Sequence, residues 1–323
     1  MNDSLLVAQL AVIVAGGAPL VLAAVGETFS ERAGIVNLSL DGSLMLAALA
    51  AFVFARGTNS LVVGAVAGMM VGMVAALIVA FASIELRQSQ VAVGFVLALL
   101  CKDMAIFFGA SHRSEAGLSI PYLTIPVLSD IPFLGGVFFR QNIFAYLSFL
   151  AVFAAWVWIY RTKAGLALRA VGERPETAFA RGTAVNRARY LYAALGGLLV
   201  GLGGAAYTLS VTTTWLESQI AGNGWIALAI VIFGGWHPLR VALGVYLVAA
   251  LRGVVTGLQG QIGRSVLELL NALPWVLMLL TLVAVSRSEW LVGILPARLQ
   301  PMMRSLLRAR PPTALGTRFE QEG

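Results

Sequence analysis

Long stretches of apolar residues, separated by short polar connections, run along most of the chain. Several stretches lack Asp, Glu, Lys and Arg for about 18 residues or more, the length of an α-helix that crosses a membrane. The pattern predicts these segments: Leu5–Val25, Leu38–Ala55, Leu61–Ile84, Gln90–Gly109, Asn142–Tyr160, Tyr190–Leu209, Gly222–Phe233, Leu239–Gly257 and Leu267–Val285. We therefore expect an all-α, polytopic transmembrane helical bundle with about 8–10 spans.

Two segments depart from this pattern. Gly222–Phe233 is short for a hydrocarbon core about 30 Å thick. Thr28–Asn37 is too polar to span the membrane and too apolar for a plain loop. Non-helical backbone is tolerated at membrane depth only where protein covers it. The bundle is therefore predicted to contain one or two broken or short helices.

Composition agrees with a membrane protein. Of the 323 residues, 59% are hydrophobic and 11% are charged, whereas about a quarter are charged in a typical soluble domain. The net charge of +7 needs no nucleic acid as a partner, because short cytoplasmic loops of membrane proteins retain Lys and Arg. The single cysteine, Cys101, excludes an internal disulfide.

Basic residues predict the orientation of the chain in the membrane. Seven of them lie in the connection 161–189, and six more follow Ser286, so we expect both regions in the cytoplasm and Ser111–Arg140 outside. The chain then divides into a single transmembrane domain at 1–295, which includes the cytoplasmic loop 161–189, and a basic, flexible cytoplasmic tail at 296–323.

Small residues form two stripes that let another helix backbone approach closely. The first stripe repeats every four residues and consists of Gly64, Gly68 and Gly72. The second lies in a later span and consists of Gly196, Gly197, Gly201, Gly203 and Gly204. We interpret both as packing surfaces that identify no substrate.

Motifs of enzymes and metal sites are absent from the sequence. It has no G-x-x-x-x-G-K-[ST] phosphate loop and no H-E-x-x-H, and no Cys or His residues stand at metal-ligand spacing. No catalytic residue, metal site or cofactor is therefore predicted, and the chain is not expected to hydrolyse ATP with a phosphate loop.

The long basic connection has an internal order of its own. Pro175 suits the first position of a helix, where its missing N–H needs no partner. Glu176 follows in the first turn, where the helix dipole favours a negative charge, and Gly182 suits the residue past the end. The spacing predicts a two-turn helix on the cytoplasmic face, with Ala178 and Phe179 available for docking. The alternative is a solvated loop whose charges only set the topology.

Polar residues inside predicted spans are costly and are therefore candidates for a solute pathway. They are Asn37, Ser39, Asp41, Gln90, Lys102, Asp103, Asn223, Glu268 and Asn271. Asn37 and Asp41 are four residues apart and would share a face if that piece is helical. Trp225 could stack on a planar base or sugar, or anchor a helix end at the membrane interface.

Three blocks of the sequence together resemble a known family. Leu168–Val185 resembles the L-R-A-V-G-E-N-P…G-I-x-V loop of permease subunits in ABC importers of the sugar, nucleoside and branched-chain amino acid group. Gly26–Gly42 resembles the early G-E…E-R-A-G-x-x-N-L-G-L-E-G segment of these subunits. Gly222–Pro238 resembles their late G-x-G-x-x-A-L-A…F-G-x-W-x-P segment. The blocks keep the family's order, and the nucleoside-type branch is most similar.

The resemblance implies a division of labour. Two permease subunits, identical or different, form the pathway in a bacterial cell (inner) membrane, in contact with membrane lipid. Separate ATP-binding cassette subunits energise it from the cytoplasm, where the C-terminus lies, and an extracytoplasmic solute-binding protein delivers a nucleoside or simple sugar. The implied pathway residues are Asn37, Ser39, Asp41, Gln90, Asn223 and Trp225. The implied docking residues in the coupling loop are Arg169, Gly172, Glu173, Pro175, Ala178 and Gly182.

Two alternatives remain open from the residues alone. A secondary transporter or channel driven by an ion gradient would use the buried acids as proton or sodium sites, but it would not explain the delimited basic helix. A structural subunit without a pathway would leave the buried polar residues unexplained.

Overall fold

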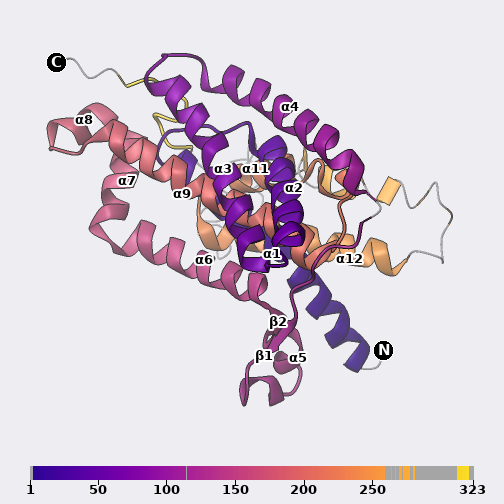
Figure 1. Ribbon diagram of the computed structural model, residues 1–323. Helices are drawn as coiled ribbons and strands as arrows, with labels where there is room; N and C mark the ends of the chain where they lie inside the picture. Colours follow the sequence, from indigo (N-terminus) through magenta and orange to yellow (C-terminus); the bar gives the residue numbers. More distant parts are fainter. Residues whose placement is uncertain are drawn as a thin grey trace.

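The computed structural model describes residues 3–113, 115–258 and 311–319, together with 263, 266, 269–270, 272–276 and 279–280. Helices dominate this part of the chain (Figure 1). The elements are α1 (Asp3–Arg32), α2 (Leu40–Thr58), α3 (Leu61–Ile84), α4 (Gln90–Gly109), η1 (Ala110–His112), β1 (Tyr122–Thr124), η2 (Leu128–Asp130), α5 (Leu134–Phe138), β2 (Arg140–Asn142), α6 (Ile143–Arg161), α7 (Lys163–Glu173), α8 (Pro175–Ala180), α9 (Val185–Ala206), η3 (Tyr207–Val211), α10 (Glu217–Ile220), α11 (Asn223–Phe233) and α12 (Pro238–Gly257).

Seven helices in the described residues are long and apolar enough to cross a membrane: α1, α2, α3, α4, α6, α12, and α9 with its π-helical continuation η3. They correspond to seven of the nine predicted segments, so the prediction of a polytopic helical bundle is confirmed. The predicted segment Gly222–Phe233 corresponds to α11, which has 11 residues and is short, as its sequence indicates. The predicted span Leu267–Val285 lies largely outside the described residues.

Side-chain caps explain why several helices begin where the sequence predicts. Ser60 accepts a hydrogen bond from the backbone N–H of Val63 at the start of α3, and Ser89 accepts one from Ala92 at the start of α4. Such caps satisfy donors that have no partner inside the helix. The bounds of α3 and α4 agree with the predicted spans residue for residue.

Helix α9 lies at the centre of the bundle, where it contacts α1, α2 and α3. The two glycine stripes meet at the contact between α3 and α9. A Cβ atom on Gly72 would lie 2.3 Å from the carbonyl oxygen of Gly197, and one on Gly201 would lie 2.2 Å from that of Gly68. The stripes are thus packing surfaces for each other, because only glycine lets these two backbones approach so closely.

The break between α1 and α2 is shorter than the predicted segment Thr28–Asn37. Helix α1 continues to Arg32, and the non-helical backbone covers 33–39. The helix can continue because its last polar side chains find partners inside the protein, as described below. Asn37 therefore lies outside any helix, so the condition under which it would share a helical face with Asp41 is not met.

Helix α6 separates the connections 111–140 and 161–189. The antiparallel pair β1–β2, in which Tyr122 is opposite Asn142, leads into α6 together with α5, and α7 follows α6 directly. Figure 1 shows the two regions well apart, with β1, β2 and α5 at the bottom and α7 and α8 at the left. Since α6 is long enough to span a membrane, 111–140 and 161–189 lie at opposite ends of one span.

Candidate functional site

Two helix N-termini meet at the carboxylate of Asp41. Asp41 lies in the first turn of α2, and its Oδ1 accepts a 2.9 Å hydrogen bond from the backbone N–H of Gly224 at the start of α11. A Cβ atom on Gly224 would lie 2.2 Å from the Cα of Asp41, so glycine is needed for this approach. Because helix N-termini carry partial positive charge, the pair of termini favours an anion at this position.

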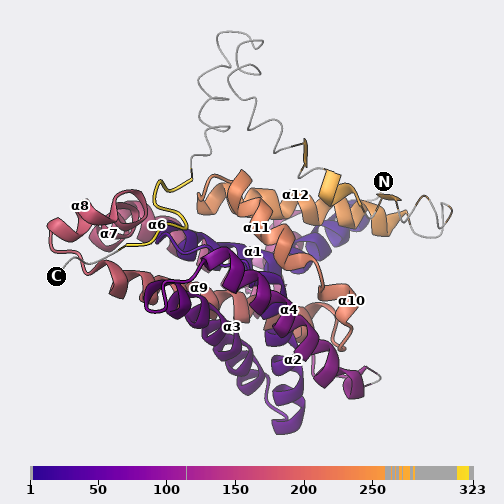
Figure 2. The same ribbon diagram turned by 90° about the horizontal axis from the view of Figure 1, so that it is seen from above.

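Asn223 joins the segments on either side of the short helix α11. Its side chain is buried, and its amide nitrogen donates to the carbonyl oxygens of Gln219 and Ile220, both at 2.9 Å. Its oxygen accepts a 2.7 Å bond from Arg252 of α12, which runs beside α11 (Figure 2). Asn223 thus anchors the start of α11, and Arg252 is a polar contact that our sequence reasoning missed. The only signal was a single arginine late in an apolar span.

The other buried candidates hold the break between α1 and α2. Asn37 receives two bonds from Ser39, from the backbone N–H at 3.2 Å and from the hydroxyl at 2.6 Å. Its own N–H donates to Glu27 at 3.2 Å. Gln90 accepts a 2.7 Å bond from the N–H of Val36. These side chains supply the partners that buried, non-helical backbone requires, and they position the start of α2.

Of the remaining candidates, those within the described residues are more open to the surroundings. Trp225 is half-buried in the third position of α11 and packs against the main core. Lys102 is half-buried and Asp103 is exposed on α4. Glu268 and Asn271 lie outside the described residues. Of these residues, Trp225 is the nearest in sequence to the contact between Gly224 and Asp41.

A second polar junction ties the end of α1 to α6 and to the turn before α12. Arg32 donates to the backbone oxygen of Trp236 and to the hydroxyl of Tyr160, both at 3.1 Å. Glu31 accepts a bond from the indole N–H of Trp236. His237 stacks on Tyr160 with ring centroids 4.9 Å apart. Burial lowers the pKa of His237, and the positive charge of nearby arginines lowers it further. A lowered pKa keeps this imidazole neutral at pH 7.

The basic connection 161–189 folds into two helices. The predicted helix is α8, which begins at Pro175 and is followed by Gly182 with a φ of +86°. It has 6 residues and is preceded by α7, an amphipathic helix that we did not predict from the sequence. A Cβ atom on Gly172 would lie 2.1 Å from the carbonyl oxygen of Arg32, so α7 packs directly on the end of α1.

The predicted docking residues fall into two groups. Gly172, Pro175 and Ala178 are buried, and Ala178 packs with Val171 and Val185 beneath α8. These residues hold α8 in place, and their side chains face the protein.

The second group can meet another molecule. Glu173 and Gly182 are exposed, as are the neighbouring residues Glu176, Phe179 and Arg181. Arg169 is half-buried, with its guanidinium 5.3 Å from the centre of the Tyr160 ring.

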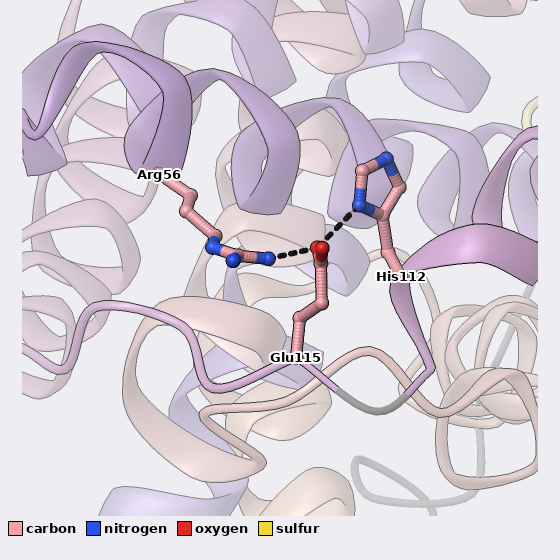
Figure 3. Close-up of polar contacts among 3 residues, drawn as sticks. All are labelled: Arg56, His112 and Glu115. Carbon is pink, nitrogen blue, oxygen red and sulfur yellow. Dashed lines mark hydrogen bonds and ion pairs between the residues drawn. The ribbon is translucent and has the colours of Figure 1, made fainter.

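A charged cluster lies at the opposite end of the bundle, between the end of α2 and the segment after α4. Arg56 and His112 point at the same carboxylate oxygen of Glu115 (Figure 3), with 2.5 Å between His112 and that oxygen. Arg113 makes a two-pronged contact with Glu217 of α10. The contacts of Arg56 with Glu115 and of Arg113 with Glu217 link residues that are far apart in sequence, and our sequence reasoning assigned them no role.

Comparison with known proteins decides between the possible functions. The family described as "Branched-chain amino acid transport system / permease component" matches residues 9–284. The chain belongs to this family. The permease is thus a transport component and the transmembrane subunit of an ABC importer, as the three sequence blocks imply. This membership rules out the alternative of an ion-gradient-driven transporter.

Three relatives cover most of the permease. The "Putative glucose ABC transporter permease protein" of Haloferax volcanii is 38% identical over 236 residues, 72% of each chain. The guanosine ABC transporter permease protein of Bacillus subtilis is 34% identical over 277 residues, 81% of this chain and 84% of that one. The nucleoside ABC transporter permease protein of Lactococcus lactis is 33% identical over 251 residues, 74% of this chain and 78% of that one. No solved structure matches the permease.

Proposed function

We propose that the permease passes a nucleoside or simple sugar across the membrane beside the junction of α2, α11 and α12. The observation that carries this proposal is the carboxylate of Asp41, which lies between two helix N-termini within a bundle of spanning helices. Short or broken helices whose N-termini end at membrane depth form solute sites in several transporter folds. The names of the relatives refer to guanosine, nucleoside and glucose.

The chemistry of such solutes fits the residues at this junction. Nucleosides and sugars carry several hydroxyl groups, which a carboxylate such as Asp41 can accept as hydrogen bonds. Trp225 offers an aromatic face for a base or a sugar ring. Asn37, Ser39, Gln90 and Asn223 hold the backbone around this place, so we assign them positioning roles in the pathway.

Energy and substrate would come from separate proteins. ATP-binding cassette subunits supply the energy, since the sequence contains no phosphate loop, and they dock on α8 and the exposed end of α7. A second permease subunit completes the pathway, and an extracytoplasmic solute-binding protein delivers the solute at the face that holds 111–140. The permease lies in a bacterial inner membrane with its C-terminus in the cytoplasm.

Reconstitution tests this proposal directly. Proteoliposomes that contain the permease, its ATP-binding protein and its solute-binding protein should accumulate labelled guanosine or glucose only when ATP is present on the side of α8. A panel with one nucleoside, one pentose, one hexose and one branched-chain amino acid identifies the solute class. Uptake of the amino acid alone would contradict the proposed substrate.

The orientation makes a separate prediction. Single cysteines at Glu176 and at Ser119, each in a Cys101→Ser background, should differ in intact cells: an impermeant thiol reagent labels the cysteine at 119 and leaves the one at 176 unlabelled. The reason is the basic cluster at 161–189, which stays in the cytoplasm. Permeabilised cells, in which both sites react, are the control. Labelling at 176 without labelling at 119 would reverse the topology.

A further inference from the structure

The C-terminal segment, defined here as Pro311–Phe319, lies on the surface formed by α7 and α8. The backbone N–H of Ala314 donates to the carbonyl oxygen of Gly172 at 2.9 Å. Thr313 donates to the Glu173 carboxylate twice, from its N–H at 3.3 Å and from its hydroxyl at 2.8 Å. In Figure 2 the segment is the yellow trace beside α7. The segment thus binds two residues of the predicted docking loop, although about 140 positions separate them in sequence.

The same segment also reaches the break between α1 and α2. The N–H of Gly316 donates to the carbonyl oxygen of Gly34 at 3.1 Å. Gly34 has a φ of +89° and ends the turn that follows α1. The C-terminal segment therefore connects the end of α7 with the break that leads into α2. Four residues of the segment contact three separate parts of the chain: the end of α7, the break before α2, and α8. The segment is therefore folded onto this surface.

Its outward side continues the exposed side of α8. The Phe319 ring packs against Phe179 with centroids 5.7 Å apart, and Phe179 remains 38% exposed. Pro312 and Ala314 face the protein, whereas Arg318 is exposed. The two rings form a small apolar patch that draws on both segments. Exposed basic residues lie beside this patch: Arg174 and Arg181 flank α8, and Arg318 belongs to the C-terminal segment.

We propose that the ATP-binding subunit docks on a composite surface made from α8 and the C-terminal segment, an inference that rests on the proposed docking at α8. In protein–protein interfaces, a few aromatic and arginine side chains near the centre contribute most of the binding energy, and a polar rim surrounds them. Phe179 and Phe319 form that centre, and the arginines belong to the rim. The partner chemistry that fits is an apolar groove bordered by Asp and Glu side chains.

The C-terminal segment also prepares the surface for binding. Helix α8 has only 6 residues, too few to be stable by itself. The bonds from Thr313 and Ala314 to the end of α7 and the packing of Phe319 on Phe179 hold α8 in one position before the partner arrives. A surface that is ordered in advance binds more tightly, because less conformational freedom is lost on association.

Affinity measurements on the full-length permease in detergent test the composite surface. The probe is the ATP-binding protein that copurifies with the tagged permease from its native cells. We expect Phe319→Ala to weaken binding about tenfold or more, and Arg318→Glu to weaken it in a way that depends on salt concentration. Phe107→Ala, which removes an exposed phenylalanine on α4, is the matched control and should bind as the unaltered permease does.

A parallel variant on α8 separates this inference from the proposed function. If Phe179→Ala weakens binding while Phe319→Ala and Arg318→Glu do not, docking at α8 stands and the composite surface is overturned. If none of the three variants weakens binding, docking at α8 itself is wrong. Thermal unfolding of each variant identifies a loss of fold, and Arg318→Glu removes no buried group, so it still tests the surface if Phe319→Ala is unstable.

Discussion

Asp41→Asn is expected to remove most ATP-driven uptake while the permease stays folded. The asparagine keeps an oxygen that can accept the N–H of Gly224, so the contact between α2 and α11 survives. What disappears is the negative charge at two helix N-termini. A charge-assisted hydrogen bond to a solute is worth about 1.5–3 kcal/mol, which corresponds to a loss of about tenfold to a hundredfold in solute binding.

Initial rates of uptake, measured with the solute found by reconstitution, give the result for Asp41→Asn. Asp103→Asn is the matched control, because it removes a carboxylate that is exposed on α4 and should leave uptake unchanged. The thermal unfolding midpoint should fall by only a few degrees, since charge at a helix N-terminus contributes about 0.3–2 kcal/mol. Unchanged uptake, or a collapse of the midpoint, would make Asp41 a structural residue.

Sequence reasoning succeeded where the signal is local. The long spans follow from apolar length alone, and serine caps fix the starts of α3 and α4. The position of α8 follows from Pro175 and Gly182, each of which constrains its own backbone. In each of these cases the residues that determine the structure lie within a few positions of the structure they determine.

The same reasoning failed where the partner is distant. Glu31 and Arg32 stand next to each other in a polar stretch, and nothing local shows that Trp236 and Tyr160 will pair with them. Without those partners, the stretch Thr28–Asn37 looked too polar to span the membrane. Distant pairing thus accounts for both the missed junction and the misplaced break.

Contacts of the backbone explain another part of what the sequence could not reveal. Two of the bonds that hold the C-terminal segment run from backbone N–H groups to the carbonyl oxygens of Gly172 and Gly34. Any residue except proline can make such bonds, so no residue type marks them. The interpretation of 296–323 as a basic tail rested on its charges and could not foresee these bonds.

A large loss of stability is expected from Gly201→Val. Gly201 lies on α9 where it meets α3, and its Cβ position is 2.2 Å from the carbonyl oxygen of Gly68 and 2.7 Å from the Cα of Met69. Both neighbours are backbone atoms, which cannot move aside as a side chain can. The two helices must separate, and overpacking of this kind costs about 1–3 kcal/mol or more.

Gly57→Val is the matched control, because no heavy atom lies within 4 Å of its Cβ position on α2. Thermal unfolding in detergent should therefore show a lowered midpoint and a low folded yield for Gly201→Val, with little change for Gly57→Val. Gly201→Ala should fall between them, since alanine adds the clashing Cβ without the two further methyl groups. If Gly201→Val unfolds at the same temperature as Gly57→Val, the close contact between α3 and α9 does not hold the bundle together, and the glycine stripes need another explanation.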